Sequence, residues 1–363
     1  MMATAPEAPR PRTLRETLAG GAAQLSSRGS TATTAAALVG ALVVTGVVIA
    51  VLGASPIAAV RAIVSGSLGS TYNFGQTLSV TAPLALTGLA AAIPFSARLW
   101  NAGGEGQLYA GAIAGVLIAL TAPPLPHVAL AALALVGGMV AGSLWASIAG
   151  ILKAAFGANE IITTLMLNFI ALLVADYVIT GPWAAPAAST TKNIPANATL
   201  PIIWSGTTVG TGALIALAAV VAANVLMKNT TLGFGIRAVG AGGDAAKLAG
   251  FRIPTLTVSA FAAGGAFAGI AGAIAVLGVQ YALVANISEN YGFTGIAVAL
   301  IARLNPLLII PSAFFFAITS VGGNNLTATT GISPSASLII TAAFVIFLLA
   351  FGVIKLSYPE RSA

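Results

Sequence analysis

Long apolar runs are the feature that most limits what this chain can fold into. Six runs approach the roughly 20 residues that a helix needs to cross about 30 Å of hydrocarbon. They cover residues 35–53, 76–96, 128–151, 206–227, 254–278 and 335–354. Charged residues make up only 6 % of the chain, against about 25 % in a typical soluble domain. The sequence therefore predicts an all-α polytopic membrane protein, with about ten transmembrane segments.

The distribution of cations predicts the topology of these segments. The spans that complete the ten are 107–122, 161–180, 293–302 and 307–322. With both termini in the cytoplasm, every lysine and arginine except Arg61 and Lys192 then lies on the inner side, a strong positive-inside bias. The net charge of +7 therefore marks the cytoplasmic face rather than a nucleic-acid partner. Three short spans, the third, eighth and ninth, are candidates for half-helices or re-entrant segments, which are tolerated where protein or a cavity covers them.

The chain divides into a polar N-terminal segment, a membrane domain and a short tail. Residues 1–34 are rich in Ala, Ser, Thr and Pro, and we expect a disordered cytoplasmic N-terminus. Residues 35–355 form the transmembrane domain, with its largest inner loop at 228–253, and 356–363 form a cytoplasmic tail. The first apolar run could be a signal-peptide core, but its length and long polar lead favour a retained span.

The residues needed for most catalytic and metal chemistry are missing. The chain has no cysteine and one histidine, His127, so thiolate catalysis, histidine triads and HExxH zinc sites are excluded. It also has no GxxxxGK[ST] phosphate loop, so any ATP that drives the protein binds to another chain. We therefore expect no enzyme, no metal site and no bound cofactor in this chain.

The first of three polar groups is RLWNAGGEGQL at 98–108. It contains Asn101, Glu105 and Gln107 together with three glycines, which allow a sharp turn. Ionisable groups inside a bilayer usually mark a pathway. Glu105 also lies near the start of a span, where it can accept hydrogen bonds from backbone N–H groups that a helix start leaves unpaired. Capping of a broken helix and lining or gating of a path are both open, and the two roles can coexist.

The second group is a polar stripe within GANEIITTLMLNF. Its members fall within about a 140° arc of one helix and are Glu160, Thr163, Thr164 and Asn168. Path lining and hydrogen bonding between helices explain the stripe equally well. Glu160 also lies in the first turn of its helix, where an acidic group suits the helix dipole.

The third group lies in the inner loop 228–253. The segment GDAAKLAGFR predicts one short helix, with Asp244 as the N-cap and Gly250 as the C′ residue. A docking site for a partner and a plain turn between spans are both compatible with this helix. On the outer side, Glu289 and Tyr291 could border an entrance.

A weak internal repeat links two parts of the chain. The segment GLAAAIPFSARLWN (88–101) resembles GIAVALIARLNP (295–306), with Gly88 paired to Gly295 and Arg98 to Arg303. Both segments run from outside to inside in the predicted topology, so a duplication would be parallel. Such repeats often frame a transport path, although small-residue patterns are common to membrane helices in general.

Four motifs in one order resemble a family of ABC importer permeases for nucleosides and simple sugars, which is distantly related to branched-chain amino-acid permeases. NAGGEGQ (101–107) resembles its N-I-G-x-E-G-Q motif, and NEIITTLMLNFIA (159–171) resembles N-E-V-I-S-T-L-M-L-N-Y-I-A of the nucleoside-type branch. RAVGAGGDAAKLAGFRI (237–253) and YGFTGIAVALIARLNPL (291–307) resemble two further family motifs. The resemblance runs from about residue 55 to 355, and one departure is Gly242, where the family commonly has Asn.

The resemblance implies the permease subunit of an ATP-driven importer in the bacterial inner membrane, carrying a neutral polyhydroxyl solute. It implies a nucleoside first and a simple sugar as the alternative. It also implies a second permease subunit, identical or homologous, ATPase subunits that hold ATP and Mg, and an extracytoplasmic solute-binding lipoprotein, all within membrane lipid.

The resemblance also suggests roles for particular residues. Those expected to couple to the ATPase are Arg237, Gly240, Asp244, Ala245, Ala246 and Gly250. Those expected to line or gate the path are Asn101, Glu105, Gln107, Glu160, Thr163, Thr164 and Asn168. An ion-coupled secondary transporter is the rival within transport, and it is disfavoured because Glu105 and Glu160 are expected near the inner ends of spans rather than at mid-membrane.

Overall fold

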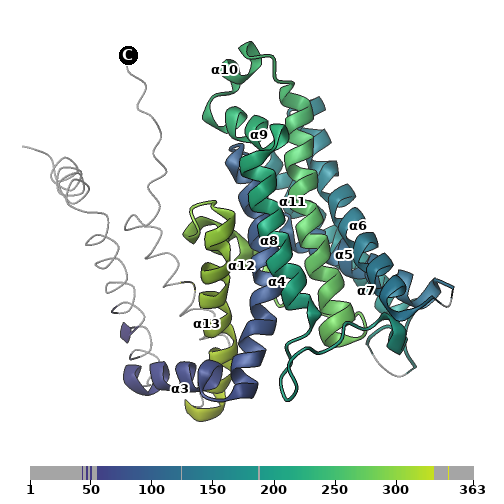
Figure 1. Ribbon diagram of the computed structural model, residues 1–363, viewed down its shortest axis with the longest axis vertical. Helices are drawn as coiled ribbons and strands as arrows, with labels where there is room; N and C mark the ends of the chain where they lie inside the picture. Colours follow the sequence, from purple (N-terminus) through teal and green to yellow (C-terminus); the bar gives the residue numbers. More distant parts are fainter. Residues whose placement is uncertain are drawn as a thin grey trace, which may run out of the picture.

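The computed structural model describes residues 55–123, 125–186 and 189–330, with isolated positions at 43, 46, 47, 50 and 342. In these ranges, six helices are long and apolar enough to cross a membrane. They are α4 (Thr71–Ser96), α6 (His127–Phe156), α7 (Glu160–Thr180), α8 (Thr211–Asn229), α11 (Ile253–Ala275) with the π-turn η2 (Val276–Gln280), and α13 (Ile309–Thr330) with the 3₁₀ turn η3 (Pro306–Leu308). Figure 1 shows these helices running along one common direction.

Shorter helices complete the fold at its centre and its two ends. They are α3 (Pro56–Leu68), α5 (Gly104–Thr121), α9 (Thr231–Ala241), α10 (Gly243–Leu248), α12 (Tyr291–Ile301) and the 3₁₀ turn η1 (Ala196–Ala198). In Figure 1, α3 lies across one end of the bundle, while α9 and α10 lie at the opposite end. We call these the α3 end and the α10 end.

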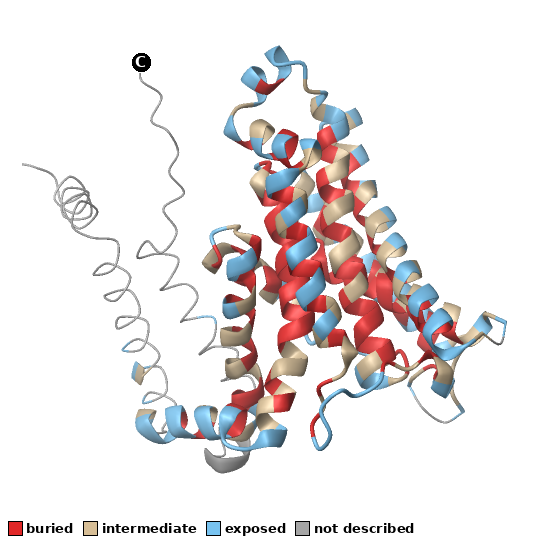
Figure 2. Ribbon diagram, in the orientation of Figure 1, coloured by how far each residue is buried: buried red, intermediate tan, exposed pale blue. Residues whose placement is uncertain are grey.

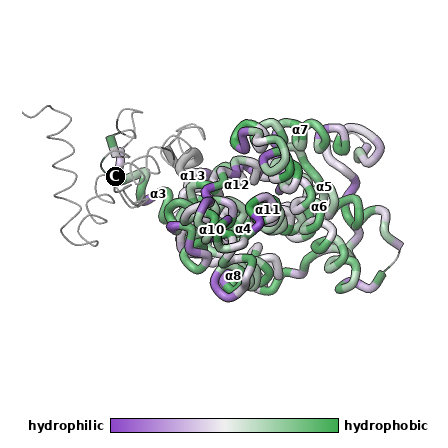
Figure 3. Tube along the Cα trace, turned by 90° about the horizontal axis from the view of Figure 1, so that it is seen from above, coloured by the Kyte–Doolittle hydropathy of each residue, from purple (hydrophilic) through white to green (hydrophobic). Residues whose placement is uncertain are grey.

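The centre of the bundle is formed by α4 and α11, whose residues are mostly buried, whereas only about a third or fewer of the residues of α6, α7 and α8 are buried. Seen along the bundle in Figure 3, α4 and α11 lie between α8 and α7, and the burial in Figure 2 follows the same order. Small residues on α11 allow this close packing. A Cβ atom added to Gly272 would lie 2.0 Å from the carbonyl oxygen of Leu108 on α5.

Most predicted spans coincide with observed helices. Helix α12 has 11 residues and is about 17 Å long at 1.5 Å per residue, so it cannot cross a bilayer alone. The short length of α12 agrees with the half-helix expectation for segment 293–302. The half-helix expectation is wrong for 307–322, because η3 and α13 continue as one full-length apolar helix.

The predicted segments 1–34, 335–354 and 356–363 lie outside the described residues, except for residue 342. Most of the predicted first span also lies outside them.

The two segments of the suggested repeat end in the same geometry. Helices α4 and α12 both close with the paired hydrogen bonds of a Schellman motif, and Arg98 and Arg303 occupy the left-handed position at φ 58° and 53°. The next asparagine, Asn101 or Asn305, accepts a hydrogen bond from the N–H two residues later. These shared details support a duplicated helix–turn–helix unit, α4–α5 and α12–α13.

Candidate functional site

The polar turn between α4 and α5 folds back into the bundle. Asn101 is only 1 % exposed, and its Nδ2 donates to the carbonyl oxygen of Ala90 at 3.0 Å. The side-chain amides of Asn101 and Gln107 also pair with each other, at 2.9 and 3.2 Å. Since Ala90 precedes Ser96 by six residues, the turn reaches about 9 Å inside the end of α4. Glu105 therefore lies in the first turn of its helix, as expected, but that helix start is buried inside the bundle.

Helix α7 caps the start of α5. The Oδ1 atom of Asn168 accepts from the N–H of Gly106 at 2.8 Å, and its Nδ2 donates to the carbonyl oxygen of Ala102 at 2.9 Å. The hydroxyl of Thr164 accepts from the N–H of Ala102 at 3.3 Å. Both side chains are at most 2 % exposed. These contacts fit the hydrogen-bonding interpretation of the polar stripe.

Glu105 in turn caps the start of α12. Its side chain is 3 % exposed and accepts from the hydroxyl of Ser288 and from the N–H of Gly292, the latter at 2.9 Å. The N-cap residue of α12, Asn290, makes no side-chain capping bond of its own. Glu105 is therefore a capping group, as expected, but it caps a different helix from the one it begins.

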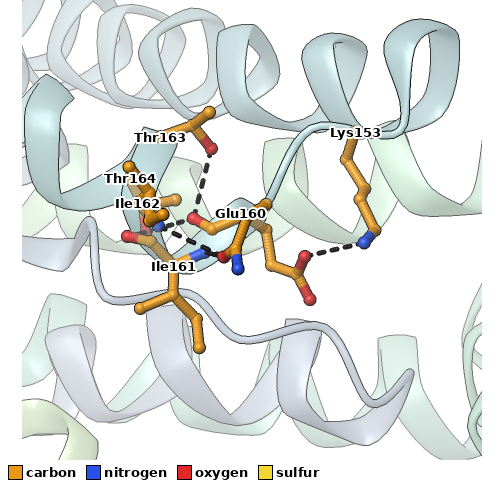
Figure 4. A network of polar contacts seen from close by, with 7 residues as sticks. Lys153, Glu160, Ile161, Ile162, Thr163 and Thr164 are labelled. Atoms are coloured by element: carbon orange, nitrogen blue, oxygen red, sulfur yellow. Dashed lines mark hydrogen bonds and ion pairs between the residues drawn. The ribbon is translucent and has the colours of Figure 1, made fainter.

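The other half of the stripe lies at the turn between α6 and α7. A carboxylate oxygen of Glu160 forms an ion pair with Lys153 at 2.8 Å, as Figure 4 shows. The hydroxyl of Thr163 donates to the carbonyl oxygen of Glu160 at 3.2 Å. Asn159 caps α7 by accepting from the N–H groups of its first turn. The stripe thus separates into a buried pair, Thr164 and Asn168, and a pair at the helix start.

A cavity of about 340 Å³ opens in the half of the bundle toward the α3 end. Its walls come from α4, α11 with η2, α13 and the segments 202–208 and 281–291. Its polar lining residues are Gln76, Ser79, Thr208, Gln280, Tyr281, Glu289, Tyr291, Ser320 and Asn324. This lining contains one carboxylate and no cation. Such a surface suits an uncharged solute with several hydroxyl or amide groups.

One cavity wall is built from irregular backbone. Helix α11 changes into the π-turn η2, and Tyr281 then adopts the left-handed conformation at φ 57°. The hydroxyl of Tyr291 donates to Glu289 at 3.3 Å, and the hydroxyl of Thr87 on α4 donates to the carbonyl oxygen of Tyr291 at 2.9 Å. Glu289 and Tyr291, which the sequence suggested as possible entrance residues, thus lie together on the wall of the cavity.

None of the seven residues expected to line a path contributes to this cavity. Instead, the turn that carries Asn101, Glu105 and Gln107 lies beyond it. The cavity reaches Pro83 along α4, whereas the turn contacts α4 at Ala90. The interlocked contacts of Asn101, Glu105, Gln107, Thr164, Asn168 and Ser288 are here called the polar knot. Along α4, the polar knot lies closer to the α10 end than the cavity does.

Sequence analysis missed most of the cavity residues. On α4, Gln76, Ser79 and Pro83 share one face at helical spacing, and Ser320 and Asn324 do so on α13. This helical spacing of polar residues was the sequence signal that could have identified the cavity residues. It is weak because serine, threonine and asparagine also serve as hydrogen-bonding groups between membrane helices.

The predicted loop helix is present as α10, but its start differs from the expectation. Gly242 is the N-cap residue and Asp244 lies within the first turn without a capping bond, so the N-cap prediction is wrong. Gly250 has φ 88° and closes the helix with Schellman bonds, so its C′ prediction is confirmed. The exposed members of the predicted coupling set are Arg237, Asp244, Ala245 and Gly250, whereas Gly240 and Ala246 are buried.

Helix α9 joins this loop to the helix bundle. A Cβ atom added to Gly240 would lie 2.0 Å from the carbonyl oxygen of Ser96, the last residue of α4. The turn that leads to Glu105 begins directly after Ser96. Helix α9 therefore contacts the end of α4, directly before the turn that leads into the polar knot.

In the part of the chain that the structure describes, no three histidine, aspartate or glutamate side chains are close enough to hold a metal ion.

Comparison with known proteins agrees with this architecture. The chain is 34 % identical to the glucose ABC transporter permease protein TsgB13 of Haloferax volcanii, over 87 % of this chain and 86 % of the relative. It is 32 % identical to the nucleoside ABC transporter permease protein NupB of Lactococcus lactis, over 87 % and 90 %. It is 33 % identical to the guanosine ABC transporter permease protein NupP of Bacillus subtilis, over 84 % and 89 %. Residues 73–349 match the family described as the permease component of branched-chain amino acid transport systems, and the chain belongs to this family of ABC transporter permeases.

Proposed function

We propose that this chain is the permease subunit of an ATP-driven nucleoside importer and that the cavity is the solute-binding part of its path. The observation that carries the proposal is the cavity lining, which combines tyrosines, hydroxyls and amides with no cation. A nucleoside has a flat aromatic base and an uncharged polyhydroxyl sugar. Tyrosine rings can stack on such a base, while amide and hydroxyl groups bind the sugar.

Two relatives support a nucleoside, because they are named as nucleoside and guanosine permeases. A simple sugar is the second candidate, since another relative is named as a glucose permease. The same hydroxyl and amide groups would bind a sugar, so the aromatic side chains Tyr281 and Tyr291 distinguish the two candidates. A tyrosine ring that stacks on a nucleoside base contributes more binding free energy than one that packs against a single sugar ring.

Partner subunits complete the proposed transporter. ATPase subunits, with their ATP and Mg, would bind at the α10 end, which we assign to the cytoplasm. A second permease subunit would border the path, and a solute-binding lipoprotein would deliver the solute at the α3 end. The plasma membrane of a bacterium fits the positive-inside distribution of the cations.

Alternating access is the mechanism that we infer from the placement of these parts. The polar knot lies further along α4 toward the α10 end than the cavity does, and in this mechanism it closes the path on that side. Movement of α10 on ATP binding would reach the end of α4 through the contact between Gly240 and Ser96. That movement would displace the turn at residues 97–103 and open the path between the cavity and the α10 end.

The test is uptake of labelled adenosine in cells that express the permease with its ATPase and lipoprotein partners. We expect Tyr291→Ala to raise the half-saturating adenosine concentration about tenfold, through loss of an aromatic contact worth about 1–1.5 kcal/mol. Tyr177→Ala on α7 is the matched control, because Tyr177 is 64 % exposed and is not a cavity residue. Uptake of glucose with no uptake of adenosine would instead establish the sugar candidate.

A further inference from the structure

The cavity wall at residues 288–292 contains two neighbouring residues in an unfavourable backbone conformation. Glu289 has φ 46° and Asn290 has φ 65°, both in the left-handed region. Asparagine tolerates this region, but glutamate adopts it rarely. Such a conformation persists only where the surrounding structure fixes it, and it is concentrated at functional sites. The contacts that fix this wall therefore decide where the side chains of Glu289 and Tyr291 lie.

The strained pair is held from both sides by one carboxylate. On one side, the hydroxyl of Ser288 donates to Glu105 and accepts from the N–H of Asn290 at 3.1 Å. On the other side, the N–H of Gly292 donates to the second carboxylate oxygen of Glu105 at 2.9 Å. The two donors are four residues apart and enclose Glu289, Asn290 and Tyr291.

Glu105 makes these contacts without belonging to the cavity. It lies on α5, is 3 % exposed and is absent from the cavity lining. The approach of the two helices is also very close, because a Cβ atom added to Gly292 would lie 2.1 Å from the backbone nitrogen of Glu105. The start of α5 and the start of α12 are thus fixed to each other at one point.

A carboxylate is the side chain that this arrangement requires. The hydroxyl of Ser288 and the N–H of Gly292 are both donors, and they bind separate oxygens of Glu105. An ionised carboxylate offers two acceptor oxygens, whereas glutamine offers one acceptor and one donor group. Glutamine could keep one of the two bonds, and alanine could keep neither.

We propose that Glu105 is a positioning residue for solute binding, acting through Ser288 and Gly292 to hold the cavity wall that presents Glu289 and Tyr291. This inference rests on the proposed function of the cavity. It gives the buried carboxylate of the NAGGEGQ segment a role without direct contact to the solute. It also links the turn after α4 to the geometry of the cavity, so displacement of the start of α5 would change the binding surface.

The test uses the absence of cysteine from the chain. A single reporter, Val279→Cys, is introduced into the cavity lining, where Val279 is 51 % exposed. Its rate of alkylation by a maleimide reports the shape of the wall and needs no knowledge of the solute. We expect Glu105→Ala to change this rate at least threefold and to raise the half-saturating adenosine concentration about tenfold. We expect Glu105→Gln to give values between those of the wild type and Glu105→Ala, because glutamine can keep one of the two hydrogen bonds.

Matched serine variants keep the test decisive if Glu105→Ala fails to accumulate in the membrane. Ser288→Ala removes the bond to Glu105, whereas Ser312→Ala removes a comparable buried bond from α13 to the carbonyl oxygen of Val298 on α12. We expect only Ser288→Ala to change alkylation and uptake. Equal effects of the two variants would overturn the proposal, as would a Glu105→Ala protein with alkylation and uptake within twofold of the wild type. A wild-type protein that takes up no adenosine would count against the proposed function alone, since the alkylation comparison is independent of it.

Discussion

The absence of a side chain at Gly106 allows the polar knot to form. Gly106 lies in the first turn of α5, where its N–H donates to Asn168. A Cβ atom at this position would lie 3.0 Å from both the Cα atom of Asn168 and the carbonyl oxygen of Leu167. These are backbone atoms of α7, which cannot move aside as a flexible side chain would. The glycine-rich composition around Glu105 is therefore explained by close helix approach.

This geometry predicts the effect of one added methyl group. We expect Gly106→Ala to destabilise the protein by about 1–3 kcal/mol, because overpacking forces α5 and α7 apart. The midpoint of thermal unfolding in detergent measures this change. Gly243→Ala is the control, since no atom lies within 4 Å of the added Cβ position, and its effect should stay within about 0.5 kcal/mol. Equal midpoints for the two variants would contradict this explanation of Gly106.

At the scale of elements, the polar knot is a chain of caps between helices. Helix α7 caps α5 through Asn168, and α5 caps α12 through Glu105. The N–H groups at a helix start need partners, and inside a bilayer no bulk water can supply them. Helices that begin within the bundle therefore depend on polar side chains from their neighbours. This dependence explains why a largely apolar chain retains buried asparagine and glutamate.

The short helix α10 is the element whose proposed role can be tested by itself. Leu248 is 91 % exposed at its C-terminal end, which is unusual for leucine unless a partner covers it. We expect Leu248→Asp to reduce co-purification of the ATPase subunits about tenfold or more without a change in thermal unfolding. Ile203→Asp is the control, because Ile203 is 47 % exposed and lies outside the α9–α10 loop. Unchanged ATPase retention in the Leu248 variant would remove α10 from the docking surface.

At the scale of the whole molecule, the cavity, the polar knot and α10 follow one another along the bundle. The cavity contacts α4 between Gln76 and Pro83, the knot contacts it at Ala90, and α9 contacts it at Ser96. One central helix therefore touches all three regions. This order predicts that the cavity and α10 face opposite sides of the membrane.

Sidedness can be measured with single cysteines in this cysteine-free chain. We expect a membrane-impermeant maleimide to label Leu248→Cys in inside-out vesicles only, and Ile203→Cys in right-side-out vesicles only. Both positions are exposed, at 91 % and 47 %, so a lack of labelling cannot be attributed to burial. Labelling of both positions from one side would contradict the predicted topology.

The sequence by itself determined the helical class, most spans and the family. These conclusions depend on local properties of the chain. The length of an apolar segment predicts a transmembrane helix, the positions of cations predict which side faces the cytoplasm, and short motifs indicate the family. The sequence also indicated that Gly250 closes α10, because a helix end of this kind depends on neighbouring residues.

Only the tertiary structure decided which groups meet. It showed that Glu105 caps α12, that Thr164 and Asn168 hold the turn at 101–106, and that the cavity lies elsewhere. Capping and lining depend on which helices pack together and at what depth, and helical periodicity does not specify either. The Ser288–Glu105 contact joins residues 183 positions apart, so no local pattern could have revealed it.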